Sequence, residues 1–121
     1  MQDFRELRVW EKAHALTLDI YRVTQAFPKD EIYGLTSQIR RAAVSVGANI
    51  AEGCGKDNRP DFARFLQNAA GSASEVEYHL LLARDLGYMP GDVCERLGGC
   101  ASEIKRMLTG LIQTLRKRSA A

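Results

Sequence analysis

Hydrophobic residues recur every three or four positions along most of the chain, which is the spacing of amphipathic helices. The clearest case is the segment 35–53, which reads LTSQIRRAAVSVGANIAEG. At about 100° per residue, one apolar stripe of this segment would carry Leu35, Ile39, Ala42, Val46 and Ile50. The stripe predicts a helix with one face buried in a hydrophobic core.

The same spacing predicts three further helices, separated by short segments that contain proline or glycine. The first runs from about Arg8 to Ala26, the third from Pro60 to about Leu86 with Gly87 as its cap, and the last follows Gly91. The positions expected to be buried are Val9, Ala13, Leu16, Ile20, Val23 and Phe27 in the first helix, Phe62, Phe65, Leu66, Ala69, Ala73, Val76, Leu80 and Ala83 in the third, and Val93, Leu97, Cys100, Ile104, Leu108, Leu111 and Leu115 in the last. Short connections make consecutive helices antiparallel, so we predict an all-α, up-and-down four-helix bundle. Gly71 weakens the third helix by up to ~1 kcal/mol, which predicts close packing against a neighbouring backbone.

A line of polar residues lies beside the apolar stripe of the second helix. This polar ladder consists of Gln38, Arg41, Ser45, Asn49 and Glu52. We expect Arg41 and Glu52 to be partly buried when helices or subunits pack, so that their charges need partners. We favour a network that fixes packing register over a ligand-binding role.

The first helix carries a second apolar face in addition to its core stripe. This face consists of Leu7, Trp10, Leu18 and Tyr21. Since a helix of a monomeric bundle needs only one apolar stripe, the second predicts burial against another copy of the chain. These residues are therefore candidate contacts of a homo-oligomer.

Several short segments together resemble one protein family. They are FRELRVWEKA (4–13), QIRRAAVS (38–45), ANIAEG (48–53) and FARFL (62–66), with Phe27-Pro28, Tyr33-Gly34-Leu35, Gly71-Ser72 and Leu86-Gly87-Tyr88. This combination resembles the bacterial four-helix-bundle proteins called S23 or 23S rRNA intervening-sequence proteins. The resemblance implies a homopentameric ring. Related accessory proteins of diversity-generating retroelements bind a reverse transcriptase and nucleic acid, so it also implies RNA, DNA or such an enzyme as partners.

One position departs from the family pattern. Family members often have proline where this chain has Gly47. The resemblance therefore implies a softer helix kink there, or none.

Length and composition set limits on the class of protein. With 121 residues, the chain fits a single domain, 1–121. No apolar run approaches the ~20 residues of a membrane span, and no signal peptide is visible at the N-terminus, so we expect a cytoplasmic protein. The three cysteines, Cys54, Cys94 and Cys100, are expected to be reduced and to serve as small, half-buried residues.

Catalytic and metal-binding patterns find little support. A di-metal bundle needs two Glu-x-x-His pairs, and only Glu11 with His14 has that spacing, because Glu75 lies four residues before His79. The segment 53–56 lacks the full phosphate-loop pattern. We therefore expect no enzyme activity, no cofactor and no metal.

Nucleic-acid binding would depend on local groups of cations, because the net charge is only +2. The candidates are Arg40, Lys56, Arg59 and Arg64 around the second turn, with Lys105, Arg106, Arg116, Lys117 and Arg118 in the last helix. Each alone is typical of an ordinary solvated surface, but a ring would repeat every patch around its axis. We predict a homo-oligomeric platform that binds RNA or DNA. The alternative is a protein-interaction or structural oligomer that binds no nucleic acid.

Overall fold

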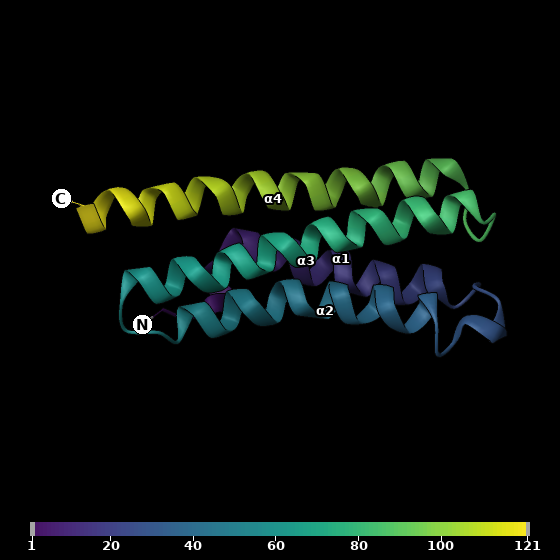
Figure 1. The fold of residues 1–121 in the computed structure, drawn as a ribbon, viewed down its shortest axis with the longest axis horizontal. Helices are drawn as coiled ribbons and strands as arrows, with labels where there is room; N and C mark the ends of the chain where they lie inside the picture. The colour runs from purple at the N-terminus through teal and green to yellow at the C-terminus, as the bar shows by residue number, and fades with distance from the viewer. Residues whose placement is uncertain (1, 121) are drawn as a thin grey trace.

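The fold consists of four long helices that run alternately up and down (Figure 1). They are α1 (Arg8–Thr24), α2 (Leu35–Cys54), α3 (Arg59–Asp85) and α4 (Gly91–Ala120), with short 3₁₀ turns η1 (Phe4–Glu6) and η2 (Lys29–Glu31). The computed structural model describes residues 2–120, and side chains only as far as residue 117. Over that range there is no strand, and no helix is long and apolar enough to cross a membrane. The four-helix bundle is confirmed.

The helices close into a bundle because each packs against two others. α2 and α4 both contact α1 and α3. The predicted stripe of α2 lies in the middle of this core, with Ile39 and Ile50 fully buried and Val46 at 1% exposure. The apolar stripes of the other helices meet it there, through Ile20, Leu66, Leu80, Leu97, Ile104 and Leu108 among others.

Some positions expected to be buried are only partly buried, namely Val23, Phe62, Phe65, Val93 and Leu111. Three further sequence expectations about the helices are wrong. α1 ends at Thr24 rather than Ala26, because Thr24 and Val23 already accept turn hydrogen bonds from Phe27 and Ala26 ahead of Pro28. Cys100 is exposed, and the next residue, Ala101, is buried in its place.

Gly71 is the third correction. It is exposed, and a Cβ there would meet nothing within 4 Å, so no neighbouring backbone approaches it. By contrast, α2 runs through Gly47 without a break.

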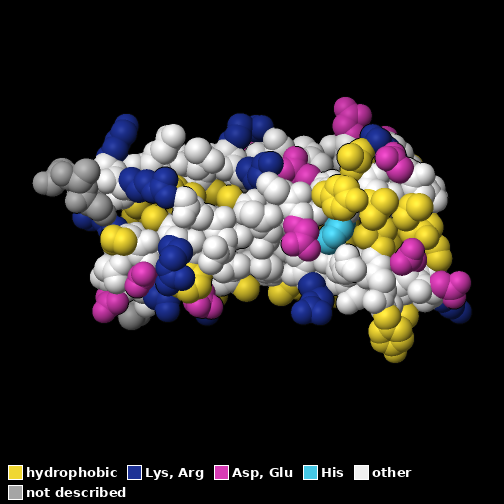
Figure 2. All heavy atoms as spheres, in the orientation of Figure 1, with side chains coloured by type: hydrophobic (Ala, Val, Ile, Leu, Met, Phe, Trp, Pro, Cys, Tyr) yellow, Lys and Arg dark blue, Asp and Glu magenta, His cyan; other side chains and the backbone are white. Residues whose placement is uncertain are grey.

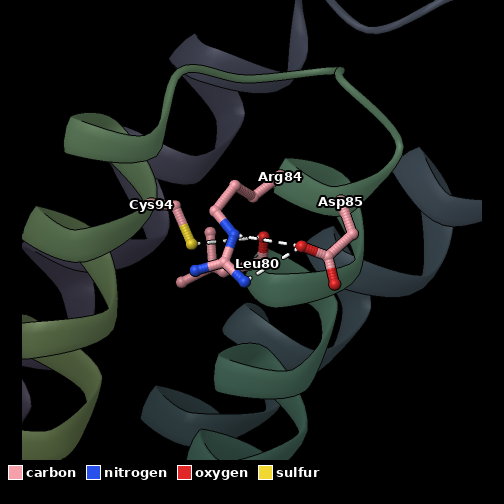
Figure 3. Close-up of polar contacts among 4 residues, drawn as sticks. All are labelled: Leu80, Arg84, Asp85 and Cys94. Carbon is pink, nitrogen blue, oxygen red and sulfur yellow. Dashed lines mark hydrogen bonds and ion pairs between the residues drawn. The ribbon is translucent and has the colours of Figure 1, made fainter.

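The helix ends are fixed by local polar contacts. The Asn58 side chain accepts the Asp61 N–H at 2.8 Å and caps α3, while Gly87 follows α3 with the positive φ of 79° that glycine tolerates. The Cys94 thiol donates to the Leu80 carbonyl at 3.4 Å and ties the start of α4 to α3 (Figure 3).

Glu31 joins the two loops at one end of the bundle. Its carboxylate accepts the Leu35 N–H at 3.0 Å and the Tyr88 hydroxyl at 2.8 Å. These two hydrogen bonds, the first more than the second, lower the pKa of Glu31. The carboxylate therefore stays ionised. Its two hydrogen bonds connect the start of α2 to the α3–α4 loop.

Val46→Asp is expected to unfold the bundle, because it places an unpaired charge at a site that is 1% exposed. The cost of several kcal/mol is comparable with the whole stability of a small domain, about 5–15 kcal/mol. Circular dichroism should show lost helicity and no cooperative melt. Gln38→Asp, at an exposed position of the same helix, is the control and should melt close to the parent protein. Normal melting of the Val46 variant would show that the α2 core face is misassigned.

Candidate nucleic-acid interface

Cations from two distant parts of the sequence meet at one end of the bundle. α3 begins there and α4 ends there, so Arg59 and Arg64 lie with Arg116 around one open pocket. Lys56 and Arg59 line a second hollow next to it. We call Lys56, Arg59, Arg64, Arg116 and the adjacent Lys117 the basic end. On the face seen in Figure 2, Lys and Arg side chains spread over the half that holds the C-terminus, whereas hydrophobic side chains gather at the other end.

Two cations of the basic end lie against one aromatic ring. The Lys56 ammonium lies 5.0 Å from the centre of the Phe65 ring, and the Arg64 guanidinium lies 4.7 Å from it. Such contacts attract a cation to the face of the ring. Arg64 also pairs with Asp61 at 3.5 Å, which offsets part of its charge.

Gly53 lies against Phe62 and Phe65 at the start of α3. A Cβ at this position would come within 3.0 Å of the Phe62 ring and 3.1 Å of the Phe65 Cβ. The contact lets α2 and α3 approach closely just before the turn between them. The helical spacing of apolar residues in the sequence does not predict this close contact, although Gly53 itself can be read from the sequence.

The remaining candidate cations lie elsewhere. Arg40 is close to the start of α2, roughly 20 Å or more along the helix from the second turn where we expected it, and its guanidinium bonds Thr24 at 2.9 Å and covers the Tyr21 ring. Lys105 pairs with Glu77 at 2.6 Å, and Arg106 donates to Ser102 at 3.0 Å. The side chain of Arg118 lies outside the described residues.

The residues of the polar ladder lie in two environments: some are hydrogen-bonded between helices and others are exposed to solvent. Asn49 donates to the Ser45 carbonyl at 2.9 Å and to its hydroxyl at 3.0 Å, and that hydroxyl bonds Ser72 of α3 at 2.8 Å. This network links α2 to α3. Arg41 and Glu52 are exposed rather than partly buried within one chain, and so is Gln38, because they lie on the solvent side of the line.

The residues of the second apolar face of α1 also differ in their exposure. Leu7 and Trp10 are partly buried against the core of their own chain, whereas Leu18 and Tyr21 are 44% and 41% exposed. Trp10 stacks on His14, with ring centres 5.0 Å apart, and sits over Gly47. A shallow apolar groove between α1 and α2 results, which we call the α1–α2 groove. Its lining includes Phe4, Trp10, His14, Val44, Ala48 and Ala51.

Comparison with known proteins identifies the family. The model of the 23S rRNA-intervening sequence proteins matches residues 5–110. The chain belongs to this family. A solved structure of a protein of unknown function from the S23 ribosomal protein family of Bacteroides thetaiotaomicron is similar to it, with a TM-score of 0.80 and 28% identity over 86% of this chain and 97% of that one. The search of curated proteins finds no match.

Within the described residues, no three His, Cys, Asp or Glu side chains gather as a metal site would require. Cys54 and Cys94 are buried free thiols, and burial, ahead of the charge of Asp3, raises the pKa of Cys54. That thiol is therefore protonated near neutral pH.

His79 is a buried polar residue that the sequence pattern did not single out as part of the core. Its side chain is 7% exposed, Nδ1 has no hydrogen-bond partner, and Nε2 lies 3.8 Å from the Glu75 carboxylate. Burial lowers the pKa of His79, and the nearby Glu75 carboxylate only partly opposes this. The neutral imidazole is therefore the form that fits the folded bundle.

Stability of this family member should fall as the pH is lowered from 7.5 to 5.5. An unfolded histidine has a pKa near 6.5 and the folded pKa is lower, so the unfolded state binds the proton more readily. The contribution is present above pH 6.5 and is lost as the pH falls through the folded pKa. Chemical denaturation of the parent and of His79→Gln should show a shallower pH dependence in the variant. His14→Gln, at the exposed histidine, is the control, and equal slopes in all three proteins would contradict the assignment.

Proposed function

We propose that this protein is a non-enzymatic, self-associating bundle that binds RNA or DNA through its basic end. The observation that carries the proposal is the convergence of Arg59, Arg64 and Arg116 on one pocket, with Lys56 beside it. Among residues 2–117, neither Lys56, Arg59 nor Arg116 takes part in an ion pair. Their charge is therefore available to phosphate groups, which planar guanidinium groups bind in a bidentate manner.

Self-association would make this modest patch effective. One chain offers a few cations, and Asp57 and Asp61 reduce the local field. A ring would present the same patch once per subunit, so that a single nucleic acid could engage several at a high effective concentration. The pentamer implied by the family resemblance is the arrangement we propose.

The α1–α2 groove is the surface we propose for contact between subunits. Val44 of α2, which lines the groove, is 45% exposed, and Leu18 and Tyr21 continue the apolar strip along α1. Small residues such as Ala48 and Ala51 would allow another helix to approach closely. Burial of these apolar groups would favour association by about 25 cal/mol for each Å² removed from water.

A protein partner is the second candidate, favoured by a different observation. Large hydrophobic side chains are exposed near the end opposite the basic end, where Tyr33 is 95% and Tyr78 60% exposed. Ile32, Leu81 and Leu86 are also exposed in these segments. Such side chains suit a protein partner, for example a nucleic-acid enzyme such as a reverse transcriptase. This binding would depend little on salt, because it rests on apolar contact.

Binding to labelled RNA and DNA should be saturable and should weaken steeply with salt, as measured by fluorescence anisotropy. Neutralising Arg59 and Arg116 together to Gln should lower the slope of log affinity against log salt by about 2, one for each phosphate contact.

Arg84 and Arg96 provide the matched control, since both are exposed arginines of α3 and α4 away from the basic end. Changing both to Gln removes the same charge and should leave the slope nearly unchanged. Failure of the parent protein to bind at low salt would refute nucleic-acid binding and leave the protein partner as the better proposal.

Light scattering should give the parent protein the mass of an oligomer, and Leu18→Glu with Val44→Glu should reduce it to that of a single chain. Two like charges in an apolar contact oppose association, while each remains solvated in the free bundle. Leu81→Glu with Leu86→Glu, at comparably exposed positions of the opposite end, should keep the parental mass. A parent protein of single-chain mass would rule out the oligomer.

A further inference from the structure

The pocket at the basic end has an apolar base as well as a charged rim. Ala63 of α3 and Leu115 of α4 line it as buried residues, while the exposed residues Pro60, Arg59, Arg64 and Arg116 line it nearer the surface. Its volume is about 530 Å³. This lies within the range of roughly 300–1,000 Å³ that sites for small molecules occupy.

This combination of surfaces fits the chemistry of one nucleotide. A nucleotide carries its charge on the phosphate, which the arginines of the rim suit. Its base has two weakly polar faces, which can lie on apolar side chains or stack on the plane of a guanidinium group. Gln67, on the same rim, offers an amide donor and acceptor that can meet the edge of a base.

Duplex nucleic acid cannot use such a pocket fully. Paired bases are stacked inside the helix, so a protein surface of this shape meets mainly phosphates and sugars. An unpaired nucleotide can instead turn its base away from the strand and into the pocket. The apolar base of the pocket would then be covered by a base rather than by water.

We propose that this pocket takes one unpaired nucleotide, so that the protein prefers single-stranded nucleic acid to duplex. The inference rests on the proposed function, because it assigns the form of nucleic acid that the basic end recognises. Arg116 has a specific role in it, since its flat guanidinium group can both hold a phosphate and stack on a base. A lysine at that position keeps the charge and loses the flat surface.

The test compares a short labelled single strand with the same strand annealed to its complement, by fluorescence anisotropy at two salt concentrations. The parent protein should bind the single strand about tenfold more tightly, which is the effect of stacking one base. Arg116→Lys should bring this ratio close to 1 while duplex affinity changes less than about twofold, because the charge is kept. Arg84→Lys is the matched control, since it is the same substitution at an exposed arginine of α3 away from the basic end, and it should retain the tenfold ratio.

The outcomes separate this inference from the proposed function. Equal affinity of the parent protein for single strand and duplex would overturn the pocket assignment while leaving phosphate binding at the basic end intact. An unchanged ratio in Arg116→Lys would also overturn it. Absence of binding to either probe would overturn both proposals. Thermal melting of each variant should match the parent, because both positions are exposed.

Discussion

The close approach of α2 and α3 at Gly53 leaves little space for a side chain, and the end of the bundle that carries the candidate site depends on that constraint. Even a methyl group there would meet Phe62 and Phe65 at about the closest distance that atoms tolerate. Since Gly53 lets α2 and α3 meet closely before their turn, the start of α3 is fixed relative to the end of α2. Phe65, whose Cβ is part of that contact, carries the ring beside which Lys56 and Arg64 lie. The core and the basic end are thus parts of one packing arrangement.

The core could be predicted from sequence because burial follows helical periodicity. Every residue of the predicted α2 stripe, from Leu35 to Ile50, is buried, and the family resemblance supplied the same fold independently. Errors arose where a position lies at the edge of a stripe. Cys100 and Ala101 are neighbours of similar size, so the period alone does not decide which of them faces inward. The expectation at Gly71 was wrong for another reason. A glycine lowers helix propensity whether or not a neighbouring backbone lies close to it, so its presence alone does not predict close packing.

The candidate site was predictable only in part, because it depends on how the helices are aligned. The sequence presented Arg59 and Arg116 as members of two separate groups, and the antiparallel order of α3 and α4 brings them together. The length of α2 separates Arg40 from Lys56, because Arg40 lies near the start of this helix and Lys56 just past its end. The predicted up-and-down topology already implies both results, but grouping the cations by their position along the chain missed them. The contacts of Phe65 and the buried setting of His79 needed side-chain packing, which a one-dimensional pattern does not contain.

The near-balance of charge in the whole chain conceals an uneven distribution in space. The sequence holds 17 Lys and Arg against 15 Asp and Glu, which alone would argue against a polyanionic partner. Several of these charges neutralise one another between helices, as Lys12 does with Glu103 and Lys105 with Glu77. Ion pairs along the sides leave the pocket between α3 and α4 with an excess of arginine. A phosphate group responds to charge within about one Debye length, roughly 8–10 Å, so this local excess matters more for binding than the total.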